Sequence, residues 1–184
     1  MHPYVVSIIG ASNQHKAIAY EDILQIYRYY ANELNALAGK PILLQSGGST
    51  GIDFIAILLF LSCPERFQGL VLHLPCEYDI EEGRFFAAHP GQEKGAQTLN
   101  QLYPLFEAET GYEARKLLSQ VLRMKGVSRT VSSGLIARNK LVAQCDLLLA
   151  ASHTNKVPPP TGGTRDTWKQ CMGERKYFLI GPSS

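Results

Sequence analysis

The stretch that most constrains the fold of this chain runs from Pro41 to Leu61, where two apolar segments meet through a glycine-rich turn. Residues 42–44 follow a proline and have the length of a buried strand, whereas residues 52–61 form a longer run without a helix breaker, typical of a buried helix. The turn between them reads Ser-Gly-Gly-Ser-Thr-Gly. A strand, a glycine-rich turn and a helix in this order predict an α/β protein.

Apolar segments and helical segments alternate along most of the chain. Strands are predicted at residues 4–9, 42–44, 69–74, 146–150 and 177–180, and helices at 17–38, 52–61, 112–125, 135–144 and 165–172. A further short helix is expected at 96–106, broken at Pro104. This alternation favours a doubly wound, mainly parallel sheet of five or more strands with helices on both faces.

The length of 184 residues fits one domain over residues 1–184. Residues 76–131 are longer than a single crossover needs, so we expect them to add a lid or an oligomerisation surface beside the sheet. Their apolar side chains lead us to expect a homo-oligomer; those side chains are Phe85, Phe86, Leu102 and Phe106. His73 lies inside a predicted strand, and we expect it to be a core histidine with its hydrogen bonds satisfied.

Charge and composition argue against several classes of partner. The net charge is +2 and lysine and arginine are not clustered, so a nucleic-acid partner is not expected. The longest apolar run contains Asp53 and is about half the length that spans a bilayer, and the N-terminus does not read as a signal peptide, so we expect a cytoplasmic protein without a membrane segment. Four scattered cysteines and five dispersed histidines predict no metal site, and no cofactor is expected.

Three loops of small residues follow predicted strands, at residues 10–13, 46–51 and 161–164. The last two also open helices, where free backbone N–H groups and the helix dipole attract anions such as phosphate. Arg138 adds a bidentate donor suited to phosphate or carboxylate. The predicted ligand-binding residues are Gly10, Ser12, Gly47, Gly48, Ser49, Thr50, Gly51, Arg138, Gly162, Gly163 and Thr164. The alternatives are tight connections without a ligand and, for Arg138, a surface salt bridge.

These motifs resemble a known family. Residues 46–53 (Ser-Gly-Gly-Ser-Thr-Gly-Ile-Asp) look like the "SGGARGID" loop of the superfamily that contains the DNA-processing protein DprA and the LOG (lysine decarboxylase-like) proteins, often called SLOG. Residues 9–12 are similar to the first-strand loop of that superfamily. Arg138-Asn139 before an apolar strand, then Gly162-Gly-Thr164 opening a helix, resembles its C-terminal pattern, which adds Asn139 to the ligand-binding residues. The resemblance covers residues 4–74 and 132–181.

The resemblance implies a Rossmann-like fold that binds a nucleotide or a nucleotide-derived phosphorylated ligand, with sensors among its members. Its LOG members are phosphoribohydrolases that cleave nucleoside monophosphates and carry a PGGxGTxxE motif. Here Thr167 stands at the position of that glutamate, and Asp166 is one position away. We therefore expect a binding protein, and no catalytic residue is assigned.

Two alternatives remain open. The first is an N-glycosidic hydrolase acting on a nucleotide, using Asp166 or a carboxylate of the middle segment such as Glu77, Asp79 or Glu82. The second is a DprA-like nucleic-acid-interaction protein, although the chain lacks the basic surface and the stacking aromatic side chains near the loops that this function needs.

Overall fold

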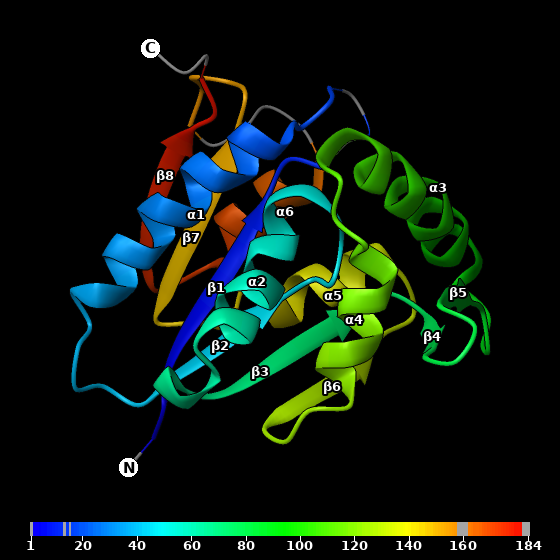
Figure 1. Ribbon diagram of the computed structural model, residues 1–184, viewed down its shortest axis with the longest axis horizontal. Helices are drawn as coiled ribbons and strands as arrows, with labels where there is room; N and C mark the ends of the chain where they lie inside the picture. Colours follow the sequence, from blue (N-terminus) through cyan, green and yellow to red (C-terminus); the bar gives the residue numbers. More distant parts are fainter. Residues whose placement is uncertain (1, 13, 15, 158–161, 182–184) are drawn as a thin grey trace.

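A six-stranded parallel sheet forms the centre of the computed structural model, which describes residues 2–12, 14, 16–157 and 162–181 (Figure 1). The order across the sheet is β6-β3-β2-β1-β7-β8, and every neighbouring pair is parallel. The strands are β1 (Tyr4–Gly10), β2 (Ile42–Ser46), β3 (Phe67–Leu74), β6 (Val127–Val131), β7 (Leu147–Ser152) and β8 (Glu174–Leu179). The chain builds outward from β1 to β6 and then returns to the other side of β1 with β7, so the strand order reverses between β1 and β7.

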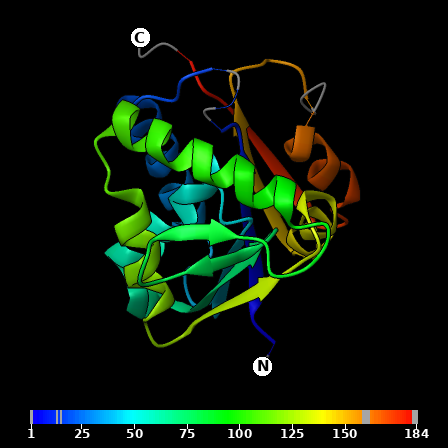
Figure 2. The ribbon, with the colours of Figure 1, turned by 90° about the vertical axis from the view of Figure 1, so that its right-hand side faces the viewer.

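Helices cover both faces of this sheet, which confirms the predicted doubly wound, Rossmann-like α/β fold (Figures 1 and 2). One face carries α1 (Tyr20–Asn35), α2 (Ile55–Ser62) and α4 (Ala114–Leu122), and the other carries α5 (Leu135–Val142) and α6 (Gly162–Gln170). Successive side chains of β1 point to opposite faces of the sheet, as in any β-strand, and so pack into two different hydrophobic clusters. Ile8 packs in the larger cluster with α1 and α2, whereas Ile9 packs with Val142 of α5.

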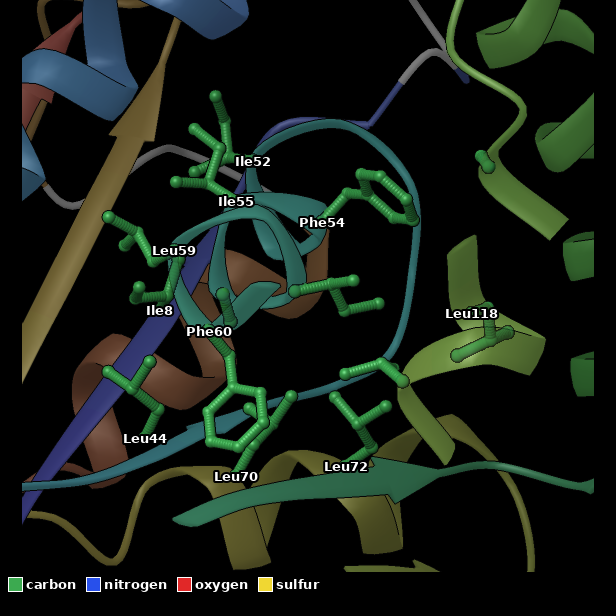
Figure 3. Close-up of a cluster of buried hydrophobic side chains, with 14 of the residues drawn as sticks. Ile8, Leu44, Ile52, Phe54, Ile55, Leu59, Phe60, Leu70, Leu72 and Leu118 are labelled. Atoms are coloured by element: carbon green, nitrogen blue, oxygen red, sulfur yellow. The ribbon is translucent and has the colours of Figure 1, made fainter. Parts of the chain in front are cut away.

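The larger core cluster is organised around the helix that the sequence predicted to be buried. A 3₁₀ turn, η1 (Gly51–Phe54), leads into α2, and a second, η2 (Pro64–Arg66), follows it. Figure 3 shows Ile55, Leu59 and Phe60 packed against side chains of the sheet. Because burial of each such side chain contributes about 1.5–3 kcal/mol, α2 is a major source of stability. Its burial confirms the prediction for residues 52–61.

The segment 76–131 differs from its prediction in three places. The helix α3 (Glu93–Thr110) continues through Pro104 instead of breaking there. Pro104 is exposed, so water can reach the backbone around it, while buried side chains on both sides, such as Tyr103 and Phe106, hold the helix. The sixth strand, β6, was not predicted because its interior residues are polar and exposed at the edge of the sheet.

The third difference is a short antiparallel hairpin formed by β4 (Glu77–Asp79) and β5 (Arg84–Phe86), which the sequence analysis did not predict. With β6 in the main sheet and α4 as a crossover helix, the hairpin and α3 are the parts of this segment that the fold adds beyond a regular crossover. Phe85, Leu102 and Phe106 are buried within the chain, and Phe86 remains exposed. A homo-oligomer stays a prediction, which light scattering can check.

Among the described residues, no helix combines the length and the apolar character that a membrane-spanning segment needs.

Candidate functional site

A cavity of about 530 Å³ lies at the carboxyl ends of β1, β2 and β7, where the strand order reverses. In open α/β sheets, ligands bind at this switch point because the two loops there diverge and leave a crevice. Most of the residues predicted from the sequence line the cavity, namely Gly10, Ser12, Gly47, Ser49, Arg138, Asn139, Gly162, Gly163 and Thr164. Asn13 and Thr161, which belong to the predicted loops, lie outside the described residues.

Three of the predicted residues lie behind the cavity wall. The carbonyl of Gly48 accepts a hydrogen bond of 2.9 Å from the Tyr103 hydroxyl, and a Cβ at this position would collide with the side chain of Leu74. A Cβ at Gly51 would collide with the backbone carbonyl of Ala11. Thr50 is fully buried. These residues shape the turn rather than face the space where a ligand could enter.

Asp53 is the main residue of the site that the sequence analysis did not select. It belongs to η1, is 6% exposed and lines the cavity. One carboxylate oxygen, Oδ1, accepts a hydrogen bond of 3.2 Å from the backbone N–H of Gly10, and Oδ2 lies 3.9 Å from Nη1 of Arg138. A carboxylate within an apolar helical run was the available signal, because a buried acid needs partners.

The charge of Asp53 is affected by opposing influences. Burial raises the pKa of Asp53 from 3.8 to about 6, although the charge of Arg138 and the backbone amides of Gly10, Ser49 and Gly47 all act to lower it. The amides of the glycine-rich loop are the groups that were expected to receive a ligand phosphate. In this structure they stabilise a carboxylate of the same chain.

Arg138 is buried at the base of the cavity rather than at the surface. From α5, its Nη1 donates to the carbonyl of Gly47 at 2.9 Å and its Nε donates to Oδ1 of Asn139 at 3.1 Å. Burial lowers the pKa of Arg138, while Asp53 acts to raise it. Thus its ion-pair partner is a buried carboxylate at the site, not an exposed acid, and the guanidinium fixes the conformation of the turn at Gly47.

Gly47 is required by this pair of charges. A Cβ at position 47 would lie 2.7 Å from Oδ2 of Asp53 and 2.8 Å from Cζ of Arg138. Both distances are too short for non-bonded atoms, so any larger residue would push the two side chains apart. The absence of a side chain at position 47 therefore makes room for the Asp53–Arg138 pair.

The start of α6 forms a second, more open part of the site. Gly162 and Gly163 are exposed, and Thr164 is half-buried. Thr167, at the position of the family glutamate, is buried and donates its hydroxyl to the carbonyl of Gly163 at 2.9 Å. Asp166 is exposed and lines the cavity.

The carboxylates of the middle segment lie elsewhere. Within the described chain, Glu77, Asp79 and Glu82 do not line the cavity. Arg129 lies 3.8 Å from Glu77, and the side chain of Arg84 pairs with that of Glu82 at 2.7 Å. The structure therefore brings Asp53 and Asp166, but not these three acids, to the candidate site.

An apolar wall faces the loops. Leu99 and Leu102 of α3 and Leu135 and Ile136 around the start of α5 line the cavity, so the middle segment contributes directly to the site. Ile136 is 69% exposed, which leaves an aliphatic surface at the cavity available to a ligand. The described lining contains no phenylalanine, tyrosine or tryptophan.

His73 is a core residue, as predicted. Its Nδ1 lies 2.7 Å from the hydroxyl of Thr130 and its Nε2 lies 3.0 Å from Oε1 of Gln45. Burial lowers the pKa of His73 to about 4, and the charge of Arg138 acts in the same direction. The imidazole is therefore neutral at physiological pH and holds β3 to its neighbouring strands.

Comparisons with known proteins add no family to this description. No protein-family model matches the chain, and a search of curated proteins gives no match. Within the described residues, no group of three or more histidine, cysteine, aspartate or glutamate side chains is placed to hold a metal ion. The class of protein is therefore defined by the structure itself, as a Rossmann-like α/β protein with a cavity at the switch point of its parallel sheet.

Proposed function

We propose that the protein binds a nucleotide or a nucleotide-derived phosphorylated ligand in this cavity. The observation that carries the proposal is that strand-end loops with backbone donors, a buried arginine and an aliphatic wall all meet at the switch point of the sheet. The volume of about 530 Å³ falls within the range typical of small-molecule sites. The protein would act as a sensor if binding of this ligand transmits a signal to a partner.

The two walls of the cavity suit the two ends of a nucleotide. Gly162, Gly163 and Thr164 supply an exposed backbone and a hydroxyl at the start of a nine-residue helix, which favours phosphate. The side chains of Leu99, Leu102 and Ile136 suit the face of a base, which they would contact without aromatic stacking. The resemblance to SLOG proteins supports the same assignment.

Calorimetric titration of AMP and of adenosine into the wild type and Thr164→Val tests the proposal. Because a hydrogen bond to a charged group contributes roughly 1.5–3 kcal/mol, the loss of the hydroxyl should weaken AMP binding about tenfold or more and leave adenosine binding unchanged. Thr98→Val, on the α3 side of the cavity, is the matched control and should not discriminate between the two ligands. Absence of binding for AMP and other nucleotides would refute the proposal.

A second candidate function, hydrolysis of the N-glycosidic bond of a nucleotide, is favoured by the position of Asp166 on the cavity lining. A carboxylate there could stabilise the positive charge that develops on the sugar during cleavage. Chromatography of free base released from AMP, with Asp166→Asn as the variant, separates hydrolysis from binding. Release that the variant abolishes would establish the hydrolase, and binding without release would leave the binding protein.

A further inference from the structure

Building on the proposed function, we propose that Asp53 determines which part of the ligand reaches the glycine-rich loop. Its carboxylate accepts a hydrogen bond from a hydroxyl of the ribose and excludes phosphate from the loop at residues 46–51. The site would thus select ribonucleotides over deoxyribonucleotides, and the phosphate would lie away from Asp53.

The first argument is that an anion already occupies the donors of the loop. The backbone N–H of Gly10 donates to Oδ1 of Asp53, and the backbone amides of Gly47 and Ser49 are hydrogen-bond donors to the same carboxylate. A phosphate placed on these amides would have to share them with Asp53. Two anions in contact repel each other strongly where water is largely excluded.

The second argument is that the carboxylate is held in place. Asp53 lies between Ile52 and Phe54, which are both fully buried, so η1 cannot rotate it out of the cavity without exposing apolar surface. On the other side, the bond from Arg138 to the carbonyl of Gly47 fixes the turn against which the carboxylate rests. Asp53 is consequently a permanent part of the cavity wall.

The third argument concerns what the carboxylate can still bind. An ionised carboxylate offers about four acceptor positions. Among the described residues, the backbone amides of Gly10, Gly47 and Ser49 act as hydrogen-bond donors to it, while Nη1 of Arg138, at 3.9 Å, is beyond hydrogen-bonding distance. Asp53 therefore keeps about one acceptor position in a cavity, where it favours a ligand group that donates a hydrogen bond.

In a nucleotide, the sugar hydroxyls are the donors that lie within a few ångströms of both the base and the phosphate. Acidic residues near the switch point of nucleotide-binding α/β sheets accept hydrogen bonds from such hydroxyls, which is a general solution for distinguishing ribose from deoxyribose. The exposed start of α6 remains available to the phosphate.

The wild-type protein tests this inference by calorimetric titration with AMP, 2′-deoxy-AMP and 3′-deoxy-AMP. Loss of a hydroxyl that donates to a charged acceptor should weaken binding roughly 10- to 100-fold for at least one of the deoxynucleotides. Equal affinity for all three would overturn the role of Asp53 and leave nucleotide binding intact. If no nucleotide binds, the proposed function and this inference both fail.

Asp53→Asn provides the second measurement, because asparagine keeps the shape of the side chain and removes its charge. We expect the variant to discriminate less between AMP and the deoxynucleotides and to bind inorganic pyrophosphate at least tenfold more tightly than the wild type. Unchanged discrimination together with unchanged pyrophosphate binding would overturn the inference. If the variant does not fold, the three wild-type titrations decide alone.

Discussion

Two loops with almost the same sequence signature have opposite structural roles in this protein. Both are glycine-rich: residues 46–51 join β2 to η1, and residues 162–164 form the first turn of α6, which comes after β7 in the chain. In the first loop, Gly47 and Gly48 are buried, and side chains of Asp53, Arg138 and Leu74 fill the space that each glycine leaves.

The second loop is open by comparison. Among the described residues other than its chain neighbours and its own helix, no atom lies within 4 Å of the position of a Cβ at Gly162, and the nearest atom to such a position at Gly163 is the side-chain amide of Asn139, at 3.1 Å. A glycine-rich loop is therefore not in itself evidence of a phosphate site. What distinguishes the two loops is which atoms lie close to their glycines: packed side chains in the first loop, and few or none in the second.

The largest effect that we predict is on Arg138→Ala, which leaves the carboxylate of Asp53 buried without its cation. Removing one partner of a buried ion pair typically destabilises a protein by about 3–5 kcal/mol. At roughly 2–4 °C per kcal/mol for a chain of this size, the melting temperature should fall by about 6 °C or more.

Calorimetric melting checks this prediction, with Arg84→Ala as the matched control. Arg84 and its partner Glu82 form an exposed pair, whose side chains are 67% and 59% accessible, so the control should change stability by less than about 1 kcal/mol. Similar melting temperatures for the two variants would mean that the Asp53–Arg138 pair does not stabilise the first loop.

The second prediction concerns pH, because Asp53 and His73 have opposite linkages. The pKa of Asp53 is raised from 3.8 to about 6, so its contribution to stability is complete below pH 3.8 and is lost as pH rises through about 6. The pKa of His73 is lowered from 6.5 to about 4, so its contribution is present above pH 6.5 and is lost as pH falls through about 4.

Each shift corresponds to about 3 kcal/mol, and the two nearly cancel between pH 4 and 6.5. In Asp53→Asn the contribution of His73 is no longer opposed by that of Asp53. As pH is lowered from 6.5 to 4, the free energy of unfolding of this variant should therefore fall by up to about 3 kcal/mol more than that of the wild type. Urea denaturation of both proteins at pH 4.5 and 6.5 measures the difference. Parallel pH profiles would show that the anion of the first loop does not titrate as the structure indicates.

The sequence predicts the elements of this site better than the contacts between its side chains. The strand and helix segments, the buried helix α2 and the convergence of the loops follow from apolar periodicity and from the geometry of parallel sheets. The Asp53–Arg138 pair does not, because its members are far apart in the chain and meet only after the sheet has formed. The exposed polar strand β6 lacked an apolar signal altogether.

Gly48 shows the consequence for an experiment designed from sequence alone. Gly48→Val would then be expected to leave the protein folded and to block the ligand. In the structure, a side chain at this position collides with Leu74 behind the cavity wall, so loss of binding in this variant would report a disturbed fold.

A smaller effect is expected for Gly47→Ala. The added Cβ meets the Asp53–Arg138 pair, and such overpacking typically costs about 1–3 kcal/mol. Gly163→Ala is the matched control in the second loop, since there the nearest atom to the Cβ would be the side-chain amide nitrogen of Asn139, at 3.1 Å, and the substitution should cost less than about 1 kcal/mol. Chemical denaturation compares the two variants. If Gly163→Ala proves the more destabilising, the second loop is not the more open one.

The smallest predicted effect separates backbone strain from ligand binding. Gly162 and Gly39 both adopt left-handed backbone conformations, with φ of 85° and 86°, and in the described part of the chain no atom beyond their immediate neighbours lies within 4 Å of the position of a Cβ at either glycine. Substitution by alanine should therefore cost the same at both positions, about 1 kcal/mol, because strain alone acts. Gly162 lines the cavity, whereas Gly39 lies beyond the C-terminal end of α1 and outside the cavity lining.

If the start of α6 holds phosphate, the two variants should have equal melting temperatures but unequal affinities for AMP, with Gly162→Ala the weaker binder. Equal melting temperatures with equal affinities would show that the openness of the second loop does not serve a ligand. In that case both glycine-rich loops would owe their composition to backbone conformation and packing, and the contrast between them would be one of burial alone.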